Sequence, residues 1–103
     1  MKLKKGVRIL GVKPELAFVM PVIDWVVSKY DLVEGCVITS VVDGKHGRGS
    51  KHYSGYGIDI RTRNIERVVM KKACVSGLKM ALGSDFDVVL EKDHIHLEYD
   101  PKH

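Results

Sequence analysis

Two clusters of histidine and aspartate side chains are the part of this sequence with the clearest chemical meaning. His52 and Asp59 lie seven positions apart near the middle of the chain, and His96 lies near its end. Two imidazoles and one carboxylate are a ligand set of catalytic zinc, which takes three protein ligands and leaves its fourth position to water. Structural zinc sites usually fill all four positions with cysteine and histidine. These residue types therefore predict a hydrolytic zinc centre.

The first two of these residues can meet only if the chain turns back, because seven positions is too long for the i, i+4 spacing of neighbours on one helix face. Residues 55–61 predict a strand in which Ile58 and Ile60 alternate with Asp59. Successive side chains of a strand point to opposite faces of the sheet. We therefore expect the isoleucines to face the core and the Asp59 carboxylate to face a cleft.

The third ligand is expected from a hairpin of two strands, residues 86–90 and 94–99, joined by a short turn. Both strands show the apolar alternation of half-buried strands. In the second strand one face carries Ile95, Leu97 and Tyr99, and the other carries His94, His96 and Glu98. A metal bound there and at Asp59 would tie the hairpin to the rest of the chain and contribute to folding free energy.

Two helices and one more strand complete the predicted fold. A helix begins at Pro14, and Pro21 should kink or restart it because proline removes an amide donor. The apolar stripe of this helix is Leu16, Val19, Ile23 and Val26. Residues 36–42 are rich in β-branched side chains and predict a buried strand, whereas the polar, glycine-bearing residues 43–54 predict a loop.

The second helix is predicted from a cap at Asn64 to about Leu82, with Gly83 at its end. Its predicted buried stripe is Ile65, Val68, Val69, Val75, Leu78 and Leu82. The element order is then α-β-β-α-β-β, and we expect an α+β fold in which a small antiparallel sheet packs against two helices. Residues 1–103 suffice for one such domain and not for two.

Composition narrows the classes of partner and compartment. A hydrophobic share of 45% with 29% charged residues is ordinary for a soluble globular protein. The net charge of +4 favours an anionic partner such as a cell-wall polymer, while the lack of a basic stripe interleaved with aromatics argues against nucleic acid. Met1 to Leu10 lacks the apolar stretch of a secretion signal, and the longest apolar stretch, Leu16 to Val27, is broken by Pro21 and Asp24 and too short for a membrane span. We therefore expect a protein made in the cytoplasm, and we expect it to be a monomer. Cys36 and Cys74 lack CxxC spacing and predict two buried free thiols.

Two motifs of the chain resemble those of a known enzyme family. They are Ser50-x-His52-x-x-Gly55-x-Gly57-x-Asp59 and, downstream, Asp93-x-x-His96. The pair resembles the motifs of the zinc D,D-carboxypeptidase, D-Ala-D-Ala dipeptidase and L-alanyl-D-glutamate endopeptidase family. The stretch from Asp43 to Ile60 is also similar to the zinc site of the hedgehog signalling domain, which shares that fold. The resemblance covers about Thr39 to Glu98. The chain departs from the family pattern at Gly57, where the family usually has alanine, which is also a small residue.

This resemblance implies roles for four residues. His52, Asp59 and His96 would hold one zinc ion per chain, and Asp93, three positions before the last ligand, would be the general base. The base would take a proton from the attacking water and pass it to the leaving amine. Glu91 is the alternative base, and strand alternation does not decide between the two because both lie in the turn.

Further polar residues near the motifs are candidates for contacts with the substrate. The carbonyl oxygen that becomes anionic during hydrolysis needs a hydrogen-bond donor, for which His94, Arg48 and His46 are candidates. Arg48 and Lys45 are equally candidates to bind a substrate carboxylate or to remain solvated loop charges. Ser50 has no His-Asp partners in triad order, so we expect it to donate hydrogen bonds rather than to act as a nucleophile.

The resemblance implies a zinc peptidase that hydrolyses a peptide bond of the peptidoglycan stem, of the D,D-carboxypeptidase or L-alanyl-D-glutamate endopeptidase type. In its small size and its lack of a signal, the chain most resembles a phage lysis enzyme, which reaches the wall when a holin opens the membrane. A bacterial wall-remodelling enzyme is the next expectation. The alternative from another class is a catalytically silent zinc module for partner binding or a phage structural component, which would not need a base such as Asp93.

Overall fold

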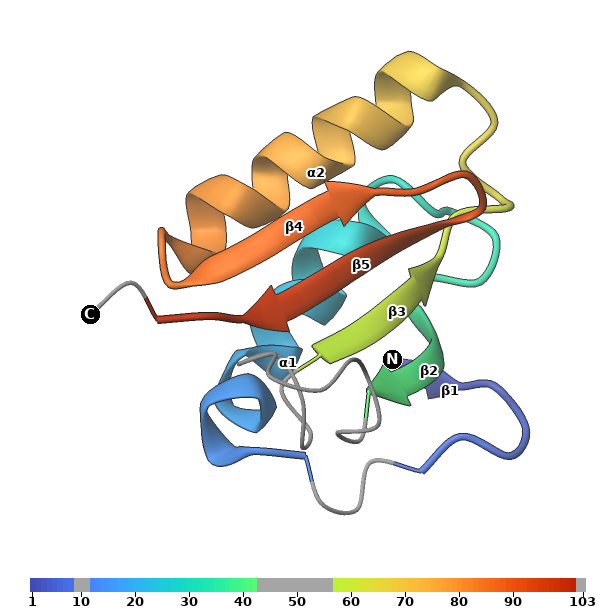
Figure 1. Ribbon diagram of the computed structural model, residues 1–103. Coiled ribbons are helices and arrows are strands. Elements are labelled where there is room, and N and C mark those ends of the chain that lie inside the picture. The colour runs from blue at the N-terminus through green and yellow to red at the C-terminus, as the bar shows by residue number, and fades with distance from the viewer. Residues whose placement is uncertain (9–11, 43–56, 102–103) are drawn as a thin grey trace.

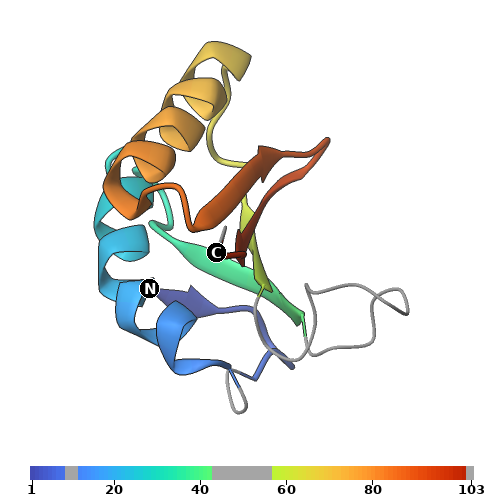
Figure 2. The same cartoon turned by 60° about the vertical axis from the view of Figure 1, so that its left-hand side comes forward.

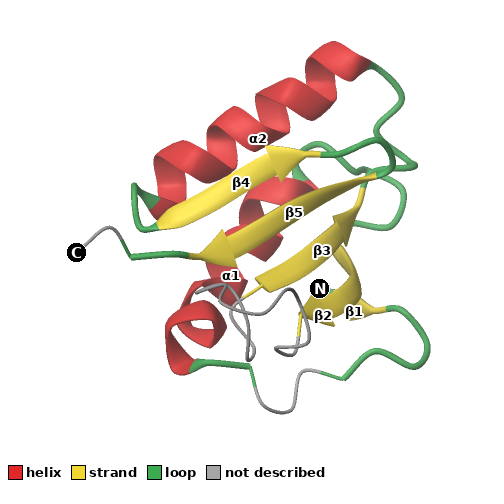
Figure 3. Ribbon diagram, viewed as in Figure 1, coloured by secondary structure: helices red, strands yellow, loops and turns green. Residues whose placement is uncertain are grey.

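The computed structural model describes residues 1–8, 12–42 and 57–101. In these ranges the elements are β1 (Lys2–Leu3), α1 (Pro14–Ser28), β2 (Val37–Val42), β3 (Gly57–Arg61), α2 (Val68–Leu82), β4 (Phe86–Leu90) and β5 (His94–Tyr99) (Figures 1 and 3). The predicted α+β class is confirmed, and the element order differs from the predicted one by β1, which precedes the first helix. The predicted loop over residues 43–54 lies outside the described residues.

The described strands form one sheet in the order β1-β2-β3-β5-β4. The pairs β2–β3, β3–β5 and β4–β5 are antiparallel, as predicted, whereas β1 pairs with β2 in parallel. The sheet is therefore mixed, and the prediction of a purely antiparallel sheet is wrong at this edge. The reason is that β1 has two exposed residues without alternation, and backbone hydrogen bonds such as Lys2 N–H to Cys36 O (2.8 Å) form it.

Both helices lie on the same side of the sheet (Figure 2). The core between them is formed by buried side chains of both layers: Leu16, Ile23, Val27, Ile38, Ile58, Ile60, Cys74, Leu78, Ile95 and Leu97. We call the opposite side of the sheet the open face. Because strand side chains alternate, the residues between the buried isoleucines and leucines of β3 and β5 point to this open face.

Helix α1 begins at Pro14 as predicted, and its stripe is buried at Leu16, Ile23 and Val26. The helix continues through Pro21, so the predicted restart at this residue is wrong. Packing of the following turns on the core compensates for the amide donor that proline lacks. Among the described residues, neither helix has the length and apolar character needed to cross a membrane.

Helix α2 begins at Val68 and not at the predicted cap Asn64. The side-chain amide of Asn64 instead donates to Glu34 Oε1 at 2.6 Å, a contact across thirty positions of sequence. Ile65 is buried before the helix starts, and Val68 and Val69, predicted in the buried stripe, are more than half exposed. The predicted end is confirmed: Gly83 follows the last turn with φ 84°, a conformation that favours glycine.

The two cysteines are buried free thiols, as predicted. Burial disfavours the thiolate and raises the pKa of Cys36 to about 12 and that of Cys74 to about 11, from 9.0. We expect both thiols of the native protein to react slowly with Ellman's reagent near neutral pH and both to react at once after unfolding in guanidinium. Rapid reaction of two thiols in the native protein would contradict this burial.

The same pKa values predict a loss of stability in alkali. The folded thiol pKa lies above the unfolded value, so the stabilisation is complete below about pH 9 and is lost as the pH rises toward 11 and 12. The urea concentration at the unfolding midpoint should therefore be lower at about pH 10 than at about pH 8. In a Cys36→Ala/Cys74→Ala variant, which starts less stable because of the cavities, this alkaline fall should be smaller. An equal fall in both proteins would assign it to other groups.

Candidate metal centre

Asp59 and His96, which sequence reasoning assigned to one metal, lie side by side on the open face. They are directly opposite each other in the register of β3 and β5. Asp59 Oδ1 and His96 Nδ1 are 2.7 Å apart, and both side chains are about a quarter exposed. Two residues separated by 37 positions are thus placed together by backbone pairing of the two strands. Their neighbours Ile58, Ile60, Ile95 and Leu97 are fully buried on the other face, as the alternation predicted.

The donor types and the separation of this pair fit two ligands of one zinc ion. With zinc bonds of about 2.0–2.1 Å and tetrahedral geometry, two ligand atoms lie roughly 3.3 Å apart. The hydrogen-bonded pair at 2.7 Å therefore needs to open by only roughly 0.6 Å. Within the described residues no group of three or more His, Cys, Asp or Glu side chains is arranged to hold a metal. The third predicted ligand, His52, lies outside these residues.

Glu98 is a further member of the cluster, to which sequence reasoning gave no role. His96 Nε2 lies 2.7 Å from Glu98 Oε1, so both ring nitrogens have a carboxylate partner. The hydrogen bond with Asp59, joined by that with Glu98 and opposed by burial, raises the pKa of His96 to about 9. If His96 held a metal through Nδ1, the proton on that nitrogen would be released, and the hydrogen bond to Glu98 would still fix the ring orientation. The sequence signal for this role is the shared face of His96 and Glu98, two positions apart.

The orienting role of Glu98 predicts an effect on metal affinity. Glu98→Gln keeps the size of the side chain and removes the charge, so we expect zinc affinity to fall by about 10–100-fold. Competition with a chromophoric chelator measures this. Glu91→Gln, which removes the same charge from an exposed turn residue, is the matched control and should leave the affinity unchanged. Equal affinities of the wild type and the Glu98→Gln variant would show that the carboxylate does not support the ligand.

Asp93, the predicted base, lies beside His94 at the start of β5. Asp93 Oδ1 is 2.7 Å from His94 Nδ1, and His94 Nε2 is 3.6 Å from Asp59 Oδ1. The hydrogen bond with His94 lowers the pKa of Asp93, whose side chain is 86% exposed. A chain of polar groups thus runs from the turn through His94 to the Asp59–His96 pair.

A cleft of about 330 Å³ lies on the open face, and of the two candidates for the base only Asp93 lines it. It is lined by Lys4, Thr39, Asp59, Arg61, Arg63, Asp93 and His94. Asp93 therefore shares a cleft with a predicted metal ligand. Glu91 is absent from this lining, and its backbone N–H donates to the His94 carbonyl at 2.8 Å as part of the turn. Within the described residues the geometry favours Asp93 over Glu91.

The remaining predicted site residues, Lys45, His46, Arg48 and Ser50, lie with His52 outside the described residues. The described part of the site consists of paired strands that hold Asp59, His96 and Glu98, and of a turn that holds Asp93. This arrangement offers two metal donors, Asp59 and His96, with a carboxylate beside His96 and a proton acceptor that shares a cleft with Asp59. No protein-family model, curated protein or solved structure matches the chain.

Proposed function

We propose that this protein is a zinc-dependent peptidase that hydrolyses a peptide bond of the peptidoglycan stem peptide. The observation that carries the proposal is the contact between Asp59 and His96 across β3 and β5. These two residues belong to two motifs that are far apart in the sequence and that both resemble those of the zinc D,D-peptidases. A contact between the two candidate ligands, with Asp93 in the cleft that Asp59 lines, is what a hydrolytic centre requires.

His52, Asp59 and His96 would hold the metal in this proposal. Zinc held there would supply polarisation of the scissile carbonyl and a lowered pKa of the attacking water. Asp93 accepts a proton from the attacking water and delivers it to the leaving amine. His94 contacts Asp93 and lies near Asp59, which supports a role as donor to the developing oxyanion once it releases these contacts.

The finer fold assignment is part of the same proposal. Antiparallel strands with ligands on β3 and β5, covered by two helices on one side, support the fold of the D,D-peptidases and the hedgehog domain. The place of action would be the cell wall, and a phage-type lysis enzyme would be made in the cytoplasm and reach the wall when the membrane is opened. The net charge of +4 suits approach to an anionic wall polymer.

A digest of purified peptidoglycan tests this function. The zinc-loaded protein should release fragments whose masses and new amino termini identify one cleaved bond of the stem peptide. Protein stripped with a chelator should release none, and added zinc should restore the cleavage. If the zinc-loaded protein binds the metal with high affinity and releases no fragment, the peptidase proposal is wrong and the protein is a zinc-binding module.

A further inference from the structure

The cleft beside Asp59 carries three basic side chains that have no part in the proposed hydrolysis. Lys4 follows β1, Arg61 ends β3, and Arg63 follows two positions later. We call these three residues the basic end of the cleft. Arg61 lies opposite His94 in the register of β3 and β5, on the same face as Asp59. The basic end is therefore directly continuous with the candidate metal centre.

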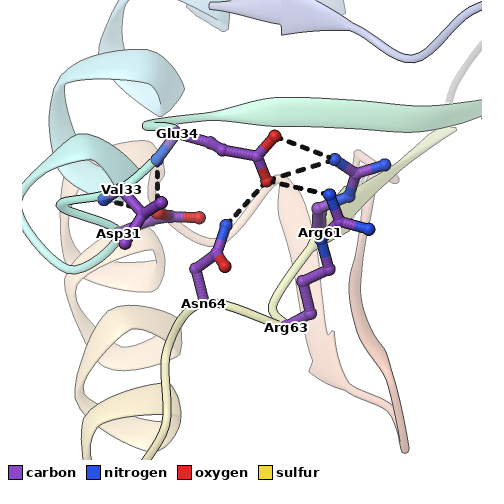
Figure 4. A network of polar contacts seen from close by, with 6 residues as sticks. All are labelled: Asp31, Val33, Glu34, Arg61, Arg63 and Asn64. Carbon is purple, nitrogen blue, oxygen red and sulfur yellow. Dashed lines mark hydrogen bonds and ion pairs between the residues drawn. The ribbon is translucent and has the colours of Figure 1, made fainter.

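A carboxylate from outside the sheet holds the two arginines in place. Glu34 accepts hydrogen bonds from Arg61 Nη1 at 3.2 and 3.3 Å, from Arg63 Nη2 at 3.3 Å and from Asn64 Nδ2 at 2.6 Å (Figure 4). The hydrogen bond from Asn64, followed by those from the arginines, lowers the pKa of Glu34. Glu34 is thus ionised at neutral pH and orients both guanidinium groups before any ligand arrives.

The charge of this network is not balanced. Glu34 is one carboxylate between two guanidinium groups, and Lys4 lines the same cleft. The carboxylates of Asp59 and Asp93 line this cleft as well, on the side of the candidate metal centre. Arg61 is packed, with 15% of its side chain exposed, whereas 64% of the Arg63 side chain is exposed. A guanidinium has five N–H donors, and within the described residues one hydrogen bond of Arg63, to Glu34, is seen. Arg63 is therefore a pre-oriented donor for an anionic group in the cleft.

We propose that the basic end binds a carboxylate of the stem peptide, within two residues of the bond that is cut. This inference rests on the proposed peptidase function. Arg61, the residue of the basic end nearest to the candidate centre, lies two positions along β3 from Asp59, which is roughly 7 Å. An extended peptide covers about the same length with two residues. The α-carboxylate of a γ-linked glutamate or the terminal carboxylate of a stem peptide lies at such a distance from a neighbouring peptide bond.

Three synthetic stem peptides of one sequence test the inference. The first has both carboxylates free, the second has the glutamate α-carboxylate as an amide, and the third has the C-terminal carboxylate as an amide. The wild type, Arg63→Gln, Lys4→Gln and the control Lys72→Gln are compared at equal zinc content. Lys72 is an exposed lysine on α2, which lies on the helix-covered side of the sheet.

We expect Arg63→Gln and Lys4→Gln each to raise KM for the first peptide by up to about fivefold, the effect of one exposed charge pair. The peptide whose amide replaces the bound carboxylate should show the higher KM already with the wild type, and the two substitutions should not raise it further. Comparison of the two amide peptides thereby identifies which of the two carboxylates is bound. Lys72→Gln should behave as the wild type with all three peptides.

Two results would overturn the inference. The first is that the wild type cleaves all three peptides with one KM, or that Arg63→Gln and Lys4→Gln change KM equally for all three. In that case no carboxylate is bound at the basic end, and the peptidase function stands. If the zinc-loaded wild type cleaves none of them and releases no fragment from peptidoglycan, the proposed function fails and this inference with it.

Discussion

Replacing Asp93 with asparagine should slow muropeptide hydrolysis by about 10²–10⁴-fold, the usual contribution of a positioned base. Asparagine keeps the shape of the side chain and does not accept the proton of the attacking water. The fold should be unchanged because Asp93 is 86% exposed and lies in a turn. Zinc content should also be unchanged, because Asp93 is not one of the predicted ligands. Turnover measured at equal zinc occupancy gives the size of the effect.

Glu91→Gln is the matched control for this experiment. It removes the same charge from the same turn, at a residue that does not line the cleft with Asp59. We expect its turnover to stay within a few-fold of the wild type. If instead the Glu91 variant loses activity and the Asp93 variant keeps it, Glu91 is the base. The pair of variants therefore decides between the two acids whichever is correct.

Asp59→Ala and His96→Ala should each abolish most zinc binding, where the wild type should hold about one zinc ion per chain. A three-ligand site that loses one ligand keeps too few donors for the metal. Hydrolysis should fall with the zinc content. Both side chains lie on the open face, so their removal leaves the hydrophobic core intact. Elemental analysis of the purified variants and circular dichroism of their fold give the two measurements needed.

Asp87→Ala provides the control for the loss of a carboxylate from the open face. Asp87 lies in β4, opposite Glu98 in the register with β5 and in the same pocket as Glu98 and His96, and it is not one of the predicted ligands. This variant should retain its zinc. A wild-type protein without bound divalent metal, even after zinc is supplied, would contradict the metal centre itself.

The hairpin at the end of the chain could be predicted closely from sequence. The bounds of β4 and β5 agree with the predicted segments 86–90 and 94–99. The reason is that their signal is local, since alternation of apolar side chains with period two defines both the strand and its buried face. The same argument placed the Asp59 side chain on the face of β3 opposite to that of Ile58 and Ile60. It brought the two described ligand candidates to one face without any knowledge of the pairing.

Features that depend on distant contacts were not predicted. Asn64 has the residue type of a helix cap, but Glu34 binds its amide and α2 starts later. The fixed orientation of Arg61 and Arg63 depends on the same glutamate, 27 and 29 positions away. Strand β1 is too short for any periodicity and is defined by its partner β2. In each case the deciding interaction joins segments whose proximity is a property of the whole fold.

The position of the candidate centre within the sheet has a consequence for local motion. β3 and β5 each have a neighbouring strand on both sides, whereas Asp93 lies in the turn that joins β4 to β5. Amide hydrogens of interior strands exchange with solvent only through large openings, and those of exposed turns exchange through small local ones. We therefore expect the candidate ligands Asp59 and His96 to lie on slowly exchanging strands, and the proposed base Asp93 to move on a faster timescale. In the proposed peptidase, such a division would let Asp93 leave its contact with His94 and approach the substrate without moving the candidate ligands.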